Sequence, residues 1–263
     1  MTAPVRNDSF FLMLGVRVDA VQIPDVILRI EQWIEKRAGC RYIVLAGMHN
    51  VIRAHNDPAF RQFINAAALS VPDGMPLVWL GRLRGEKLRR RVYGPELMEA
   101  FCEQTASKGY RHFFYGGAPG VPERVADRLS RRFPGLVVVG ICSPPFRHLT
   151  PEEDEEIVAT INRAAPDVLW VGLGTPKQEF WMHSHQHRLR VPVLAGVGAA
   201  FDFHAGVKRQ APAWMREHGF EWLFRLLQEP RRLWRRYLVY GPQFVYYVCR
   251  EALRRHAPGP DGS

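Results

Sequence analysis

Proline, lysine, glutamine and glutamate stand side by side at Pro176-Lys-Gln-Glu179, between two apolar runs. The preceding run, residues 167–173, is short and rich in valine and leucine, as expected of a strand buried on both faces. We expect Thr175 to be the N-cap of a helix that has Pro176 at its first position. Free N–H groups at such a helix start attract anions, although a capped turn without a ligand has the same pattern. The residues predicted to bind substrate at this corner are Gly174, Lys177 and Gln178.

A single carboxylate, Asp73, stands in the turn sequence Pro72-Asp-Gly74, after a possible short strand. One interpretation is structural, because an aspartate that precedes a helix can cap it. The other is catalytic, because a carboxylate at a strand end can act as a general base. The local pattern allows both.

A glycine-rich turn, Gly116-Gly-Ala-Pro-Gly120, follows another apolar segment. It has neither the GxGxxG spacing nor the lysine of a Walker A loop, so alone it is weak support for phosphate binding. Gly116 and Gly117 remain candidates for a second wall of the donor site.

Three histidines, His183, His185 and His187, suggest metal ligation at first sight. Only His183 and His187 share a helical face, however, and no HExxH motif is present. We therefore expect a solvated face, with no metal site and no cofactor.

Apolar runs and helical patterns alternate along the chain, which predicts a mainly parallel, Rossmann-like α/β sheet with helices on both faces. Ligands of such folds bind at the carboxyl ends of the strands, where the turns at Gly47, Gly116 and Gly174 are expected. The expected strands are 10–19 (a strand or hairpin), 42–46, 111–115, 136–141, 167–173 and 192–197. The expected helices are 24–36, 51–68 with a break near Pro58, 77–83, 95–108, 121–133 and 150–164.

Residues from 219 onward have a different character, with Trp, Leu and Tyr at helical spacing and arginines on another face. Such a basic amphipathic segment, divided by Pro230, suits a membrane surface, but a core helix with a solvated basic face fits equally well. The predicted organisation is an α/β core over residues 1–218, a membrane-proximal helical appendage over 219–257 and a disordered tail over 258–263. Residues 1–8 are expected to be a loose leader.

The chain has 263 residues, enough for one large α/β domain or two small ones, and 47% of them are hydrophobic. The formal net charge of +10 favours anionic partners, namely nucleic acid, phosphorylated substrates or a membrane surface. The four cysteines form no CxxC pair and are expected to be reduced thiols of a cytoplasmic protein. Neither a signal peptide nor an apolar run of about 18 residues is evident.

An ordered set of motifs, taken together, resembles the WecG/TagA/CpsF glycosyltransferase family. The set covers residues 14–237 and is specific as a whole, although no single piece is decisive. It comprises Val71-Pro-Asp-Gly-Met-Pro76, Arg91-Val-Tyr-Gly94, Phe113-Phe-Tyr-Gly-Gly-Ala-Pro-Gly120, Val171-Gly-Leu-Gly-Thr-Pro-Lys-Gln-Glu179, Gly196-Val-Gly-Ala-Ala-Phe-Asp-Phe203, Gln210-Ala-Pro-Ala-Trp214 and the segment from Glu221 to Tyr237.

The resemblance implies an inverting, metal-independent glycosyltransferase. It would move a sugar from a nucleotide-diphosphate donor, a UDP-sugar above all, to a polyprenyl-pyrophosphate-linked saccharide on the inner face of the cell membrane. Such enzymes serve exopolysaccharide, capsule or wall-polymer synthesis. No nucleic acid partner is implied, and self-association into a homo-oligomer is left open.

The resemblance also assigns roles by position. Asp73 becomes the candidate base, and Arg91, Gln178 and Asp202 become substrate-binding residues. The arginines assigned to the acceptor and the membrane are Arg225, Arg231, Arg232, Arg235 and Arg236.

The chain departs from the family at one position. Where the family commonly has Thr-x-Asn after a strand, this chain has Ala46-Gly-Met48, followed by His49 and Asn50. We expect His49 or Asn50 to supply the missing polar contact, and the identity of the sugar or acceptor is left open.

Two other classes of function compete with the transferase. A Rossmann-type oxidoreductase would need the fingerprint glycines and an acidic residue about 20 positions later, and both are missing. A non-catalytic basic module that binds nucleic acid would fit the charge, but the aromatic, amphipathic C-terminal segment suits a membrane better than a groove.

Overall fold

The structure is a computed structural model that describes residues 9–256. The predicted leader (1–8) and tail (258–263) lie outside the described residues. The strands are Phe10–Met13 (β1), Val16–Asp19 (β2), Arg41–Ala46 (β3), Leu69–Pro72 (β4), Arg111–Gly116 (β5), Val137–Cys142 (β6), Val168–Gly172 (β7) and Val193–Gly196 (β8).

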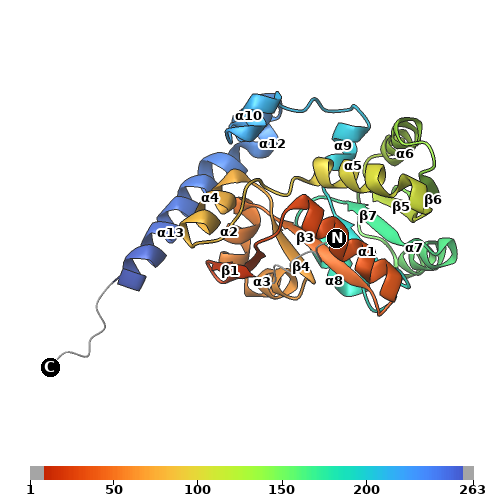
Figure 1. Ribbon diagram of the computed structural model, residues 1–263, viewed down its shortest axis with the longest axis horizontal. Coiled ribbons are helices and arrows are strands. Elements are labelled where there is room, and N and C mark those ends of the chain that lie inside the picture. The colour runs from red at the N-terminus through yellow and green to blue at the C-terminus, as the bar shows by residue number, and fades with distance from the viewer. Residues whose placement is uncertain (1–8, 257–263) are drawn as a thin grey trace, which may run out of the picture.

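Helices flank these strands, and further helices follow the last strand up to residue 256 (Figure 1). Those within the α/β part are Ile23–Lys36 (α1), Met48–Asn56 (α2), Pro58–Asn65 (α3), Met75–Leu83 (α4), Gly94–Thr105 (α5), Val121–Arg132 (α6), Pro151–Ala164 (α7), Lys177–His185 (α8) and Ala200–His204 (α9), with a short 3₁₀ turn at Ala106–Lys108 (η1). The C-terminal ones are Ala213–Glu217 (α10), Glu221–Gln228 (α11), Pro230–Trp234 (α12), the π-helical turn Arg235–Val239 (η2) and Tyr240–His256 (α13).

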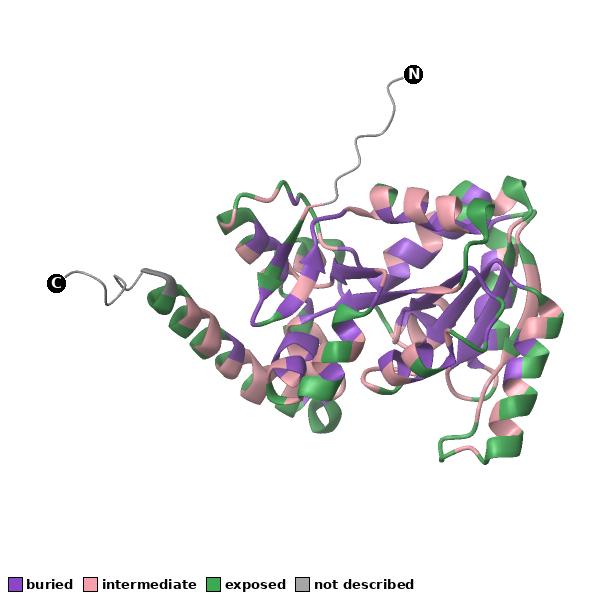
Figure 2. Cartoon of the chain, turned by 90° about the horizontal axis from the view of Figure 1, so that it is seen from below, coloured by how far each residue is buried: buried purple, intermediate pink, exposed green. Residues whose placement is uncertain are grey.

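The main sheet has six parallel strands in the order β4-β3-β8-β7-β5-β6, and β1 and β2 form a separate antiparallel hairpin. The prediction of a parallel α/β sheet with helices on both faces is therefore confirmed. Alternation along β3 shows how each strand serves two cores, since Tyr42 and Val44 face one and Ile43 and Leu45 face the other. Figure 2 shows buried residues concentrated in these strands.

Local sequence signals explain most helix boundaries. Asp57 accepts a hydrogen bond from the N–H of Phe60 (3.1 Å), so the predicted break near Pro58 separates α2 from α3. Thr150 and Glu153 form a capping box at the start of α7, with 3.2 and 2.9 Å between the paired atoms. Pro230 separates α11 from α12, as predicted.

The last helix, α13, extends away from the sheet (Figure 1), and most of its residues are exposed or half-buried (Figure 2). Phe244 anchors it to the core by packing in the cluster that includes Val51 and Leu77. Within residues 9–256, no helix combines the length and the hydropathy needed to span a bilayer.

Candidate active site

Four strand ends lie next to one another at one edge of the main sheet, because β4, β3, β8 and β7 are parallel neighbours. Asp73, His49, Gly198 and Gln178 follow these strands in the same order, Asp73 and Gly198 in turns and His49 and Gln178 at the starts of α2 and α8. Strands packed side by side thus bring residues more than 100 positions apart to one edge, where ligands of α/β sheets bind.

Asp73 lies in the turn between β4 and α4. Its N–H donates to the carbonyl of Ala46 (2.9 Å), which ties the turn to the end of β3. Gly74, at φ 124°, is the residue before α4, and no side chain caps that helix. The capping interpretation of Asp73 is therefore wrong, and the carboxyl lies instead among residues that line two cavities.

His49 and Asn50 follow β3, and the structure places them differently. His49 is half-buried and lines both cavities. Asn50 is fully buried, lines neither cavity and donates from Nδ2 to Glu179 Oε1 (3.2 Å). Of the two residues predicted to replace the family's polar contact, His49 is the one that lines a cavity.

The corner after β7 differs from its prediction in two details. Helix α8 begins at Lys177 with Pro176 as its N-cap, and the Thr175 hydroxyl donates to Glu179 Oε1 (2.8 Å) rather than accepting from the backbone. Lys177 is exposed and lines neither cavity, whereas Gln178 is buried and lines the first. The corner therefore presents the amide of Gln178, and not the lysine, to a ligand.

Glu179 organises this corner, although its position in the sequence indicated no role of its own. Its Oε1 accepts hydrogen bonds from Thr175, Gln178 (3.1 Å) and Asn50, and the residue is fully buried. Burial raises the pKa of this carboxyl, while the three donors oppose that rise. Gln178 Nε2 donates to Glu179, whereas Gln178 Oε1 is buried and has no protein partner in the described residues.

The first cavity has a volume of about 330 Å³ and is strongly cationic. Five arginines line it, and Asp73 is its one carboxylate residue among the described residues. The arginines are Arg53, Arg225, Arg232, Arg235 and Arg236. Guanidinium groups bind phosphate oxygens in a planar, two-pronged geometry, so this cavity suits a diphosphate.

The second cavity, of about 320 Å³, lies next to the first and has a largely apolar wall. The two cavities share His49, Asp73, Tyr93, Arg225 and Arg236. The apolar wall consists of Met48, Met75, Pro76, Trp222, Tyr237, Pro242 and Val245. Asp73 therefore lies where a polar and an apolar compartment meet.

Burial and neighbouring charges set the protonation of the shared residues. Burial raises the pKa of Asp73, and Glu221 raises it further, while Arg91, Arg225 and Arg236 lower it. Burial, followed by Arg236, Arg225 and Arg53, lowers the pKa of His49 well below its usual range. The site thus holds a neutral imidazole beside a carboxyl of increased basicity.

Arg91 lines the second cavity and lies beside Asp73. The guanidinium donates to the carboxylate of Glu221 and lies over the ring of Tyr93, with 4.2 Å between Cζ and the ring centroid. Glu221 comes from α11, so the C-terminal helices supply part of this site.

Several predicted residues lie outside both cavities. Gly116 packs on the end of β7, since a Cβ there would lie 2.6 Å from the carbonyl carbon of Gly172, and Gly117 donates its N–H to Gly172 (3.1 Å). Asp202 pairs with Lys208 (2.6 Å), and Arg231 is exposed. The structure gives the two glycines a packing role at the sheet edge, and the binding roles assigned to these residues stay predictions.

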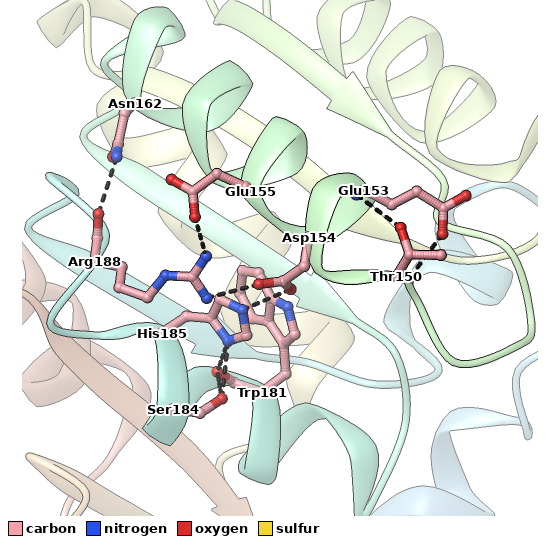
Figure 3. A network of polar contacts seen from close by, with 9 residues as sticks. All are labelled: Thr150, Glu153, Asp154, Glu155, Asn162, Trp181, Ser184, His185 and Arg188. Atoms are coloured by element: carbon pink, nitrogen blue, oxygen red, sulfur yellow. Dashed lines mark hydrogen bonds and ion pairs between the residues drawn. The ribbon is translucent and has the colours of Figure 1, made fainter.

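The expected solvated histidine face is wrong for His185. This residue is buried, with Nε2 2.8 Å from Asp154 Oδ1 and Nδ1 2.8 Å from the carbonyl of Trp181 (Figure 3). Its ring stacks on Trp181 at 4.4 Å between centroids. The contact joins α8 to α7, so His185 supports the helix that carries Gln178.

The chain is similar to named enzymes over most of its length. An enzyme of Bacillus spizizenii (strain W23) is 31% identical over 209 residues, which cover 80% of this chain and 79% of the relative. An enzyme of Staphylococcus aureus (strain MW2) is 29% identical over 256 residues, which cover 95% of this chain and 96% of the relative. Both are N-acetylglucosaminyldiphosphoundecaprenol N-acetyl-β-D-mannosaminyltransferases. Residues 11–258 match the glycosyl transferase WecG/TagA/CpsF family, and the chain, in agreement with the resemblance read from its motifs, belongs to that family of glycosyltransferases.

Proposed function

We propose that this glycosyltransferase moves a sugar from a UDP-sugar to a polyprenyl-diphosphate-linked saccharide, with inversion and without a metal ion. The observation that carries the proposal is the position of Asp73, between a cavity lined by five arginines and a cavity with an apolar wall. The named relatives act on a lipid-diphosphate acceptor and transfer N-acetylmannosamine, so that sugar is the first donor to test.

The first cavity is assigned to the donor. Arg225 and Arg236 lie near Asp73 and can bind the donor diphosphate, and Gln178 Oε1 can accept from a sugar hydroxyl or amide. As the bond between the sugar C1 and the β-phosphate oxygen breaks, its electron pair leaves with the nucleoside diphosphate. Guanidinium groups stabilise that negative charge in place of a metal.

The second cavity is assigned to the acceptor. An acceptor hydroxyl that enters from this side attacks C1 from the face opposite the leaving group, and Asp73 accepts its proton. The raised pKa of Asp73 suits this role, because a stronger base removes the proton more readily at neutral pH. The apolar wall suits the first isoprene units of a lipid carrier.

The C-terminal helices α11 to α13 are proposed as a membrane-proximal appendage on the cytoplasmic face of the membrane, beyond a core that ends near residue 218. Arg225 and Arg236 face the cavities, while Arg231, Arg232 and Arg235 are exposed, and Arg232 and Arg235 also line the first cavity. Large apolar side chains stand exposed beside them, namely Trp222, Leu227, Trp234, Leu238, Val245, Tyr246 and Leu253. Arginine with exposed tryptophan and tyrosine is typical of an anionic interface.

The decisive experiment replaces Asp73 with Asn and measures transfer from UDP-N-acetylmannosamine to a lipid-diphosphate N-acetylglucosamine acceptor. Loss of the base should lower kcat by about 10²- to 10⁴-fold with little change in donor KM. Asp127→Asn is the control, because Asp127 is an exposed residue that pairs with Arg131 on α6. Near wild-type kcat in Asp73→Asn, or no transfer by the wild-type enzyme with any UDP- or GDP-sugar, would overturn the proposal.

The membrane assignment has a separate test. A triple variant in which Arg231, Arg232 and Arg235 become Gln should sediment less with vesicles that contain anionic lipid than the wild-type protein does. Each arginine near such a surface contributes about 1 kcal/mol, so three should change the partition coefficient by about 100-fold at low salt. Equal sedimentation of variant and wild type would contradict the assignment.

A further inference from the structure

A buried ion pair between Arg91 and Glu221 joins the turn that carries Asp73 to the C-terminal helices. The N–H of Val92 donates to the carbonyl of Pro72 (2.8 Å), which fixes the segment of Arg91 beside the Asp73 turn. Arg91 Nη2 donates to Glu221 Oε2, and the side chains are 13% and 7% exposed. Glu221 is the first residue of α11, so the pair spans two parts of the fold.

Two carboxylates face the charge of Arg91. Glu221 and Asp73 both raise the pKa of the Arg91 guanidinium, yet among the described residues only Glu221 forms an ion pair with it. A carboxylate bonded directly to arginine is a weaker base, because the ion pair favours its ionised form. In the structure this direct bond is made to Glu221, and within the described residues Asp73 forms no ion pair with Arg91.

Tyr93 helps to fix the orientation of the Arg91 guanidinium. Its ring lies under the Arg91 guanidinium, 4.2 Å from centroid to Cζ, and it lines both cavities. A guanidinium held over a ring and bonded to a carboxylate has little freedom to move. The orientation of Arg91 relative to Asp73 is therefore set by one residue of the core and one residue of α11.

We propose that Glu221 is a positioning residue that holds the Arg91 guanidinium on Tyr93 and away from a direct ion pair with Asp73. Asp73 then stays free to accept the proton of the acceptor hydroxyl. This inference rests on the proposed role of Asp73. Because Glu221 belongs to α11, the base reaches its full strength only when the C-terminal helices lie over the sheet edge.

The test compares Glu221→Gln, which removes the charge at nearly constant shape, with the wild-type enzyme. We expect kcat to fall about 10- to 100-fold, because Asp73 becomes a weaker and misdirected base. When kcat is plotted against pH, the acidic limb should move to lower pH, because Arg91 can then stabilise the ionised form of Asp73. Donor KM should change little, and Glu221→Asp, which keeps a carboxylate, should recover part of kcat.

Glu217→Gln is the matched control. Glu217 lies four residues earlier and pairs with Arg90 (2.7 Å), but these side chains are 53% and 72% exposed. Exposed pairs contribute little, so its kcat and pH profile should match those of the wild type within about twofold. A kcat loss in Glu221→Gln with an unmoved acidic limb would overturn the proposal, because a purely structural role predicts that result. If Glu221→Gln does not fold, Glu221→Asp carries the test, and a wild-type kcat and limb in that folded variant would also overturn it.

An activity-independent measurement separates this inference from the proposed function. The side-chain carboxyl carbons of ¹³C-labelled aspartate are followed by NMR during a pH titration, with Asp73 assigned from Asp73→Asn. The Asp73 titration should move to lower pH in Glu221→Gln and stay in place in Glu217→Gln. An unmoved titration refutes the role of Glu221, whereas a wild-type enzyme that transfers no sugar refutes the proposed function alone.

Discussion

Asp154→Ala tests how α8, the helix that carries Gln178, is held in place. Asp154 accepts from His185 Nε2 (2.8 Å) and from Arg188 Nη1 (2.6 Å), whose side chains are 9% and 39% exposed (Figure 3). The buried bond to His185 should contribute about 2 kcal/mol as a hydrogen bond to a charged group. The more exposed bond to Arg188 should add about 0.5 kcal/mol. The sum, about 2.5 kcal/mol, corresponds to a fall of about 5–10 °C in Tm for a domain of this size.

Glu155→Ala is the natural comparison, because Glu155 also binds Arg188 (2.6 Å) but is 71% exposed and does not contact His185. Its Tm should fall by about 1 °C or less. Thermal unfolding followed by circular dichroism measures both variants. Equal losses in the two variants, or no loss in Asp154→Ala, would refute the argument that the buried bond to His185 dominates.

The pH dependence of the same variant gives a second check. Burial opposes ionisation of Asp154, but hydrogen bonds from Arg188 and His185 outweigh it and lower its pKa. A depressed pKa in the folded state means that the stabilisation is present above the unfolded pKa and is lost as pH falls through the folded pKa. The Tm difference between wild type and Asp154→Ala should therefore be full at pH 7 and shrink below about pH 4.

Four further predictions concern the active site. Gln178→Ala should raise donor KM about tenfold in steady-state kinetics, because a donor group loses its buried acceptor; an unchanged KM would contradict the assignment. The kcat of the wild type should fall on acidification with a midpoint above about pH 4, because burial raises the pKa of Asp73. A carboxyl whose pKa is raised in the folded state destabilises the fold when it is ionised, so Asp73→Asn should unfold at an equal or higher temperature than the wild type at pH 8. EDTA should leave kcat unchanged, because arginines neutralise the leaving diphosphate; a loss that a divalent ion restores would disprove metal independence.

The sequence predicted the sheet well because its signals are local. Valine and leucine runs, glycine turns and helix caps each depend on a few neighbouring residues, and they placed Asp73, His49 and Gln178 at strand ends. The order of the strands depends on long-range pairing, which no local pattern contains. That only β3 and β8 separate β4, which Asp73 follows, from β7, which Gln178 follows, is therefore known only from the structure.

The C-terminal helices show where pattern analysis reaches its limit. A basic amphipathic helix has the same period whether its arginines face water, a lipid surface or a cavity. The structure separates these cases, since Arg225 and Arg236 are half-buried at the cavities and Arg231 is exposed. The roles of Glu179 and Glu221 were missed for a related reason, because an acidic residue in a first helical turn is usually explained by the helix dipole.

The burial of Arg225 and Arg236 is itself an argument about the ligand. Burial lowers the pKa of Arg236. Within residues 9–256 neither guanidinium forms an ion pair, and each lies instead over an aromatic ring: Arg225 Cζ is 5.7 Å from the ring centroid of Phe203, and Arg236 Cζ is 5.8 Å from that of Tyr237. Removing a guanidinium from water without a paired anion is costly, and a fold keeps such groups where an anion later compensates the cost. A donor diphosphate in the first cavity would supply that anion to both arginines at once. Because the two arginines lie on α11 and η2, the same contact would also hold the C-terminal helices over Asp73, so donor binding and completion of the site would be one event.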